Sequence, residues 1–255
     1  MTIKKFLMFV CASSIYTVSF AQAKHEDTEF YEPVPAVVKP GGANSGAPSD
    51  AIILFDGKNL SEWVSTKDTT APAGWTLAKQ TITINKTAGD IQTKRRFTDY
   101  QLHIEYRIPS NITGEGQARG NSGIFLATFP GGAGGYELQV LDNYNNKTYV
   151  NGQAGSIYKQ AAPLVNACLS PGEWQKYDVV WTAPRFNDDG SVKSPGRVTA
   201  FLNGILVQNN FELKGDTPFI GQPSYHKHGA APIKLQAHGD KSEPISYRNI
   251  WVREL

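Results

Sequence analysis

Acid–base and amide side chains share one face in each of two extended segments of this chain. The residues that alternate there with apolar neighbours are Glu137 and Gln139 in the first segment and Lys234, Gln236 and His238 in the second. A histidine close to a carboxylate can transfer protons, and amides and cations can hydrogen-bond to sugar hydroxyls. If the two segments are neighbouring strands, they form a candidate carbohydrate-processing site.

A third segment has a similar polar face, in which His103, Glu105 and Arg107 alternate with apolar residues. In one sheet with the other two segments, it would add a second carboxylate to the site. The alternative is that such alternation marks only the solvated face of an antiparallel strand. Two observations favour function. Glutamine and histidine are poor strand formers, and the glycines of nearby loops, Gly134–Gly135 and Gly239, let a ligand approach the backbone.

Further candidate ligand contacts precede another predicted strand. Arg119 could hold a carboxylate or a developing oxyanion, and Asn121 could bridge sugar hydroxyls. A turn that uses asparagine and glycine for backbone reasons is the alternative. Four tyrosines lie near the glycine-rich segment, namely Tyr136, Tyr144, Tyr149 and Tyr158. We expect one of them to contact a sugar and the others to pack within the fold.

Other reactive residue types lack the partners that their chemistry requires. His226 and His228 are two residues apart, but no third metal ligand follows at an informative spacing, so we expect a structural role. Ser122 and Ser156 have no nucleophile-elbow surroundings, and Cys168 has no histidine nearby in the sequence.

The elements that must position these residues are strands. The clearest alternation covers residues 100–108, and further strands are predicted over residues 51–55, 81–85, 122–129, 136–141, 177–182 and 245–252. Asn203–Gly204 between apolar flanks predicts a two-residue hairpin turn. No window of useful length keeps a helical period. The sequence therefore predicts an all-β sandwich, with the jelly roll as its topology.

Segments of different composition precede this domain. Two lysines, an apolar run over residues 6–20 and small residues at 21 and 23 predict a signal peptide over residues 1–23, because the run is too short to span a bilayer comfortably. Cys11 lies too early for a lipoprotein cysteine. Residues 24–49 are rich in proline, glycine, alanine and serine and predict a linker, and residues 50–255 predict one domain. We expect a periplasmic or secreted protein without a transmembrane segment.

The charge and the cysteine content limit which binding partners and which disulfide bonds we expect. The formal net charge is +2, and removal of Lys4 and Lys5 with the signal peptide leaves a neutral chain. A neutral chain is poorly suited to bind nucleic acid by long-range attraction. Cys168 would remain as the single thiol, so we expect the domain to rely on its core and not on an internal disulfide.

The candidate residues fall in a series of motifs that resembles the 3-keto-disaccharide hydrolase domain family. The motifs are LFDGKNLSEW at 54–63, NSGIFL at 121–126, GYELQVLD at 135–142, GSIY at 155–158, PGEWQKYD at 171–178, LQAHG at 235–239 and YRNIW at 247–251. They occur in order and cover the chain from Ile52 to its end. One departure is Ala237, where the family often has aspartate. Its side chain should point away from His238, so we expect a change in packing only.

The resemblance implies a concanavalin A-like jelly roll that cleaves 3-keto-glycosides or 3-keto-disaccharides. A partner sugar 3-dehydrogenase would supply these substrates by oxidising the sugar at C3. The motif positions also make Asp142 and Tyr158 candidate substrate-binding residues.

The chemistry of such a substrate explains which groups the site needs. A C3 ketone acidifies the C2 hydrogen, so the C1 substituent can leave by elimination and water can then add. This route needs a base, donors or a metal at the enolate oxygen, and an acid for the leaving oxygen. Our hypothesis is that His238 or Glu137 is the base and that Glu105 orients the base or acts as the acid. Sugar binding or enolate stabilisation would fall to Arg119, Asn121, Gln139 and Gln236. A divalent metal on His238 and carboxylates is compatible with the sequence, and so is a site without one.

Two other functions fit a sandwich of this kind. One is a non-catalytic carbohydrate-binding module, because a fold does not determine a function. Such a module should expose a tryptophan platform, whereas the tryptophans of this chain fall mainly in motifs typical of packing. The other is an ordinary glycoside hydrolase that uses Glu105 and Glu137 as its carboxylate pair.

Overall fold

Strands form where the sequence alternates, and their apolar faces meet in one core. The computed structural model describes residues 23–42 and 46–255, so the predicted signal peptide lies outside the described residues except for its last position. In β6 (Tyr100–Arg107), Leu102, Ile104 and Tyr106 are buried, as the period of two predicts. The expected strand over residues 100–108 is therefore confirmed.

The described residues form two large antiparallel sheets, one of eight strands and one of five. The larger sheet runs β13 (Ile205–Glu212), β12 (Arg197–Leu202), β9 (Trp174–Thr182), β6, β15 (Ser246–Glu254), β4 (Thr81–Thr83) and β3 (Thr76–Ala78), with β1 (Ile52–Phe55) also paired to β15. The smaller sheet runs β2 (Trp63–Ser65), β5 (Ile91–Thr93), β14 (Lys234–Leu235), β7 (Ser122–Phe125) and β8 (Glu137–Val140). A separate hairpin pairs β10 (Arg185–Phe186) with β11 (Val192–Ser194). The described helices are single 3₁₀ turns: η1 (His25–Thr28), η2 (Gly116–Ala118), η3 (Pro130–Gly132) and η4 (Val150–Gly152).

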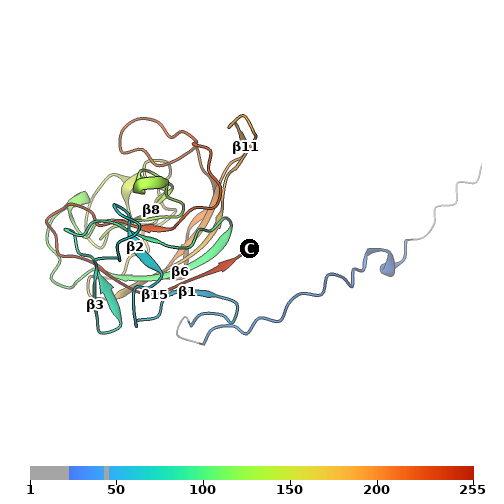
Figure 1. Cartoon of the computed structure of the whole chain (residues 1–255), viewed down its shortest axis with the longest axis horizontal. Coiled ribbons are helices and arrows are strands. Elements are labelled where there is room, and N and C mark those ends of the chain that lie inside the picture. Colours follow the sequence, from blue (N-terminus) through green and yellow to red (C-terminus); the bar gives the residue numbers. More distant parts are fainter. Residues whose placement is uncertain (1–22, 43–45) are drawn as a thin grey trace, which may run out of the picture. The chain divides into compact units, whose positions relative to one another are not determined.

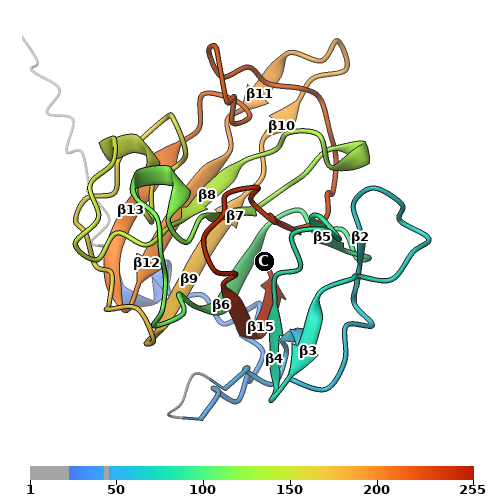
Figure 2. The ribbon, with the colours of Figure 1, turned by 90° about the vertical axis from the view of Figure 1, so that its left-hand side faces the viewer.

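The two sheets stack as a sandwich, which confirms the predicted all-β class. Figure 1 shows β6 and β15 in one layer and β2 and β8 in the other, and Figure 2 shows the succession of β13, β12, β9 and β6. The predicted turn at Asn203–Gly204 joins β12 to β13, where Leu202 pairs with Ile205. Both turn residues have positive φ, 54° at Asn203 and 80° at Gly204, as a two-residue hairpin requires.

One expected neighbourhood is absent from the fold. Strand β6, which carries His103 and Glu105, belongs to the larger sheet, whereas β8 and β14 belong to the smaller one. Because Ile104 and Tyr106 point into the core between the sheets, Glu105 faces the opposite side of β6. The three polar segments therefore do not form one continuous surface.

Buried tyrosines of the larger sheet hold the smaller sheet in place. The Tyr177 hydroxyl of β9 donates to the Gln139 carbonyl oxygen at 2.8 Å. The Tyr247 hydroxyl of β15 donates to Oγ of Ser122 at 2.7 Å, and Ser122 Oγ donates in turn to the Gln236 carbonyl oxygen at 2.6 Å. A buried hydroxyl needs such a partner, so these bonds fix the distance and register between the layers.

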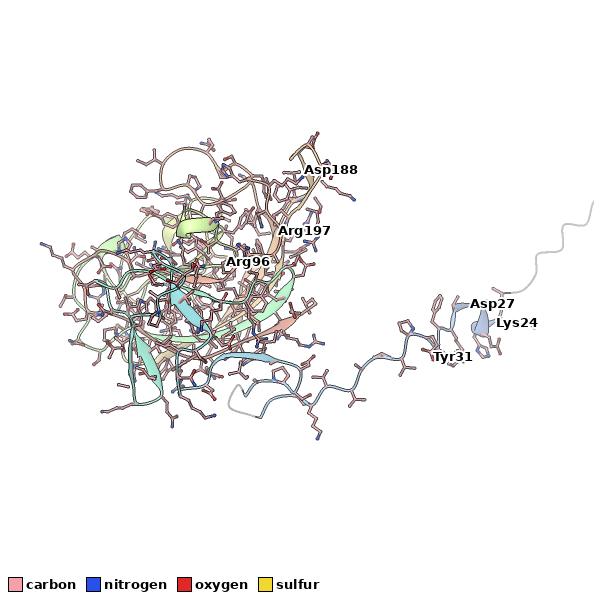
Figure 3. The ribbon with its side chains drawn as sticks, in the orientation of Figure 1. Lys24, Asp27, Tyr31, Arg96, Asp188 and Arg197 are labelled. Atoms are coloured by element: carbon pink, nitrogen blue, oxygen red, sulfur yellow. The ribbon has the colours of Figure 1, made fainter. Side chains whose placement is uncertain are left out.

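The chain divides into a unit that ends at Val37 and a second unit, Val38–Leu255, which contains both sheets. In the first unit, the backbone nitrogen of Lys24 donates to Oδ2 of Asp27 at 3.0 Å (Figure 3). In the part of the chain that the structure describes, we find no helix with the length and apolar character needed to cross a membrane.

Candidate active site

A pocket of about 300 Å³ lies on the face of the smaller sheet that points away from the core. Alternation along the strands creates this face, because Leu138 and Leu235 point into the core while Glu137 and Lys234 point into the pocket. The pocket brings together six of the residues that the sequence nominated: Asn121, Glu137, Gln139, Tyr158, Gln236 and His238.

Glu137 is buried at the floor of the pocket, and Gly123 makes room for it. A Cβ atom at position 123 would lie 2.3 Å from Oε1 of Glu137, which is closer than real contacts allow. Gly123 lies on β7, next to the strand that carries the carboxylate. The glycine in this strand is therefore explained by the approach of a functional side chain.

The surroundings of Glu137 favour its protonated form. Burial raises the pKa of Glu137 to about 8, an effect that Lys234 opposes and Asp90 reinforces. The hydrogen-bond network orients the amide of Gln139 with its nitrogen towards the carboxyl group, 3.1 Å from Oε1, and 3.0 Å from the Ser122 carbonyl oxygen. At neutral pH, Glu137 is consequently suited to give a proton.

His238 is held by a carboxylate that the sequence analysis did not single out. Oδ2 of Asp240 lies 2.8 Å from Nδ1 of His238. The backbone nitrogen of Asp240 lies farther from Nδ1, at 3.3 Å. Because a carboxylate can only accept and makes the shorter contact, Nδ1 carries the proton and Nε2 is left as a base. His238 lines the pocket with a side chain that is 36% exposed, so a substrate can reach it.

Asp240 itself is fixed from several sides. Its Oδ1 accepts hydrogen bonds from Lys86 Nζ at 3.0 Å, from the Ser242 backbone nitrogen at 2.8 Å and from the Ser242 hydroxyl. Burial alone would raise the pKa of Asp240, but the hydrogen bonds from His238, Ser242 and Lys86 hold that pKa well below its usual range. The side chain therefore stays ionised and keeps the imidazole oriented. Its position two residues after the histidine was a usable sequence signal, whereas distant Lys86 gave none.

Lys234 is a buried cation in the same pocket, with 4% of its surface exposed. Its Nζ donates to the Gly132 carbonyl oxygen at 2.9 Å, lies 3.4 Å from Oδ2 of Asp90 and stands 3.7 Å from the centre of the Phe125 ring. Burial lowers the pKa of Lys234, while Asp90 and Glu137 counteract part of that effect. The sequence placed Lys234 on the polar face but did not nominate it as a site residue.

The rim of the pocket is attached to the backbone of Glu137. Its nitrogen donates to Oγ1 of Thr217 at 3.0 Å, and its carbonyl oxygen accepts from the nitrogen of Tyr158 at 3.1 Å. Tyr158 exchanges a 2.6 Å hydrogen bond with the hydroxyl of Tyr149. Phe219 also lines the pocket, although 78% of its surface is exposed. The sequence gave no reason to select Thr217 or Phe219.

Arg119 and Asp142 are paired with one another beside the pocket and do not line it. Nε of Arg119 donates to Oδ2 of Asp142 at 2.6 Å, and Asp142 is buried. Oδ1 of Asp142 accepts from the backbone nitrogen of Tyr144 at 3.0 Å. The pair thus connects two loops that carry lining residues. This arrangement favours a structural role for both side chains over substrate binding.

Glu105 lies in a separate polar network on the outer face of the larger sheet. Its carboxylate accepts hydrogen bonds from Nε of Arg248 at 2.6 Å and Nδ2 of Asn249 at 3.0 Å, and it lies 3.6 Å from Nε2 of His103. Burial would raise the pKa of Glu105, but these partners lower it to about 2. Glu105 and Glu137 are on opposite outer faces of the sandwich. They cannot flank one glycosidic bond, and Glu105 is not part of this site.

Metal ligation finds little support in the side chains. Across residues 23–42 and 46–255, no group of three His, Cys, Asp or Glu residues is arranged to hold a metal ion. His228 instead shares a 3.0 Å hydrogen bond with the Tyr136 hydroxyl and packs among aromatic rings, in keeping with the structural role expected for it.

Comparisons with known proteins agree with the fold and with the motifs. A model of the 3-keto-alpha-glucoside-1,2-lyase-like domain matches residues 50–253. A crystal structure from Parabacteroides distasonis ATCC 8503, described as a candidate glycosyl hydrolase, is 56% identical, with a TM-score of 0.85, over 93% of this chain and 99% of that one. Another such structure from the same organism is 18% identical, with a TM-score of 0.61, over 86% of this chain and 100% of that one, and shares the fold. A comparison with curated proteins gave no match. With four fifths of its length matched, the chain belongs to the 3-keto-alpha-glucoside-1,2-lyase-like domain family.

Proposed function

We propose that this protein cleaves 3-keto-glycosides by elimination across C1 and C2, followed by hydration of the product. One observation carries the proposal: a carboxylate-oriented histidine and a buried carboxyl group, whose pKa is raised by burial, face the same pocket. An elimination needs a base and an acid of this kind. A conventional hydrolase needs two carboxylates around the bond, and the pocket supplies only one of the two that the sequence suggested.

The steps balance as follows. Nε2 of His238 removes the C2 proton, and the electron pair delocalises onto the C3 oxygen as an enolate. When the enolate collapses, a C1–C2 double bond forms and the C1–O bond breaks. The carboxyl group of Glu137 then protonates the leaving oxygen. Addition of water at C1, with return of a proton to C2, gives the free 3-keto sugar.

Neighbouring amides would hold the sugar during these steps. Asn121 and Gln139 both line the pocket, and the buried Oε1 of Gln236 has no hydrogen-bond partner among the described residues. An unpaired buried oxygen is costly, so a hydroxyl donated by a bound sugar would satisfy it. A small rotation of the Gln236 side chain would present this oxygen to a sugar hydroxyl.

The test compares a 3-keto-glucoside with its unoxidised parent in D₂O, followed by NMR. We expect cleavage of the ketone alone and deuterium at C2 of the first-formed product, because hydration returns a solvent proton there. Free 3-keto sugar incubated alone corrects for spontaneous exchange, and parallel samples with chelator report any metal requirement. Cleavage of the parent, or of neither compound, would overturn the proposal. Binding of both without cleavage would indicate a carbohydrate-binding module.

We also propose that the protein works outside the cytoplasm, downstream of an enzyme that oxidises the C3 hydroxyl of a glycoside. The lysine-led apolar segment at the start of the sequence supports export. Cell fractionation with an antibody would test it, and recovery in the cytoplasm alone would contradict it.

A further inference from the structure

The elimination leaves one charge that the base and the acid do not neutralise. When the C2 proton leaves, negative charge develops on the C3 oxygen, and a fixed cation or hydrogen-bond donor there lowers the barrier. Among the described residues that line the pocket, Lys234 is the only lysine or arginine. Other cations near the pocket are engaged elsewhere, since Arg119 pairs with Asp142 and Lys86 pairs with Asp240. Nζ of Lys159 lies 3.9 Å from the centre of the Tyr149 ring.

The position of the Lys234 ammonium group is closely determined. One N–H donates to the Gly132 carbonyl oxygen, the Asp90 carboxylate lies 3.4 Å away, and the Phe125 ring lies beneath the nitrogen. An ammonium group has three hydrogens. The two oxygens engage two of them and the ring faces the nitrogen without taking one, which leaves one hydrogen for a ligand in the pocket. The carbonyl acceptor and the carboxylate hold the nitrogen in one place and offset part of the effect of burial on the pKa of Lys234. This geometry suits donation of a hydrogen bond.

Asp90 links this cation to the segment that carries the base. Its Oδ2 faces Lys234, and its Oδ1 accepts from the Ala237 backbone nitrogen at 2.8 Å. Ala237 directly precedes His238, so one carboxylate sets the spacing between the ammonium group and the imidazole. Both groups project from residues 234–238 into the pocket.

Resting on the function proposed above, we propose that Lys234 is the electrophile of the elimination. Its ammonium group donates a hydrogen bond to the C3 ketone oxygen and stabilises the enolate, and Asp90 is the positioning residue that holds it. The role is non-covalent, so no bond forms between Nζ and C3.

The first experiment measures cleavage of an aryl and an alkyl 3-keto-glucoside by Lys234→Met. We expect kcat to fall about 10²- to 10³-fold for both substrates, as for loss of one preorganised donor to an oxyanion. The primary isotope effect on a C2-deuterated substrate should rise, because enolate formation becomes slower. Lys193→Met, which removes an exposed lysine of β11, is the matched control and should keep wild-type rates. A folded Lys234→Met enzyme with undiminished kcat would refute the role.

A second measurement does not depend on the folding of a Lys234 variant. His238→Ala binds the 3-keto-glucoside without turnover, and isotope-edited infrared spectroscopy of the bound C3 carbonyl reports its polarisation. We expect the stretch at a lower frequency than in water, and an unshifted band would overturn the proposal. A substrate adduct on Lys234 after borohydride treatment of the wild type would overturn it too, in favour of covalent catalysis. If the wild type does not cleave the 3-keto-glucoside at all, the proposed function itself is wrong. That result differs from cleavage by the wild type with no effect of Lys234, which would overturn only the role of Lys234.

Discussion

Nδ1 of His238 lies 2.8 Å from Oδ2 of Asp240, and the second oxygen of that carboxylate is held by Lys86 and Ser242. This relationship fixes which ring nitrogen carries the proton and leaves the other as the base. The base of the proposed elimination therefore depends on residues that do not touch the substrate.

Replacing Asp240 by asparagine should impair the base without preventing substrate binding. The amide can donate to Nδ1 and so favours the tautomer that protonates Nε2, which cannot remove a proton. We expect kcat for a 3-keto-glucoside to fall by up to about 10²- to 10⁴-fold, the range typical of general acid–base catalysis. KM should change little. Steady-state kinetics of Asp240→Asn and Asp240→Glu test this, and the expectation is wrong if asparagine supports the wild-type rate.

Glu137 should give the reaction an alkaline limit. Its pKa of about 8 means that the proton donor is lost as the pH rises through that value. For an alkyl glycoside, which needs its leaving oxygen protonated, kcat/KM should decline above about pH 8, because kcat/KM reports the pKa of the free enzyme. Glu137→Gln should abolish this alkaline decline and most of the rate. The loss should be smaller for an aryl glycoside, because its leaving oxygen needs less protonation. An equal loss for both leaving groups would argue against the acid role.

The same pKa predicts that stability, like activity, falls as the pH rises. Between its ordinary value of 4.5 and about 8, Glu137 is ionised in the unfolded chain and protonated in the native one. The native state then binds more protons, so the free energy of unfolding falls as the pH rises, by at most about 1.4 kcal/mol per pH unit from this group. Glu137→Gln should gain stability over the wild type across this window. Urea titrations at several pH values measure it, and a variant less stable at pH 8 would contradict it.

Gly123 should be intolerant of even one methyl group. Gly123→Ala places a carbon 2.3 Å from Oε1 of Glu137, so the carboxyl group must move. We expect loss of most activity, with the two-sheet fold retained as judged by circular dichroism. Gly229→Ala is the matched control, because a Cβ there meets nothing within 4 Å. Wild-type kinetics in Gly123→Ala would show that the position of Glu137 is not critical.

Glu105→Gln should separate stability from catalysis. The change removes the charge that His103, Arg248 and Asn249 share, yet it lies on the face opposite the pocket. The pKa of Glu105 is lowered to about 2, so its ionised form stabilises the fold above the ordinary value of 4.5, and this contribution disappears as the pH falls through about 2. We expect a lower Tm than wild type at pH 7, a smaller difference at pH 3, and an unchanged kcat. A large loss of kcat with an unchanged Tm would contradict this prediction and indicate a catalytic role for Glu105.

Phe219 should contribute to binding at the rim. An aromatic contact of this kind is worth roughly 0.5–1.5 kcal/mol, so Phe219→Ala should raise KM for an aryl 3-keto-glucoside about 2- to 12-fold. Its neighbour Ile220 is 84% exposed and does not line the pocket, so Ile220→Ala is the control. Equal effects of the two substitutions on KM would show that Phe219 makes no specific contact with the substrate.

The sequence predicted the faces of individual strands well. Alternation in residues 136–140 and 233–238 correctly placed Glu137, Gln139, Gln236 and His238 on one surface. A strand's own pattern sets which side chains point together, because successive residues alternate between faces. The same local signal located the β12–β13 turn.

Sheet membership and distant partners could not be predicted in this way. Glu105 has the same alternating context as Glu137 but lies in the other sheet, since alternation does not specify which strands pair. Asp90 and Lys86 lie in loops more than a hundred residues away in the sequence from their partners Lys234 and Asp240. Strands of three residues, such as β2 and β5, are too short to give a periodic signal.

The hydrogen bonds from Tyr177 and Tyr247 to the pocket floor limit where substitutions can change substrate specificity. The floor carries the groups proposed to react, and its backbone is bonded through the core to the opposite layer. A mutation that reshaped the floor would disturb the whole sandwich. We therefore expect substitutions around Tyr158 and Phe219 at the rim to change substrate preference at a lower cost in stability than substitutions in the floor.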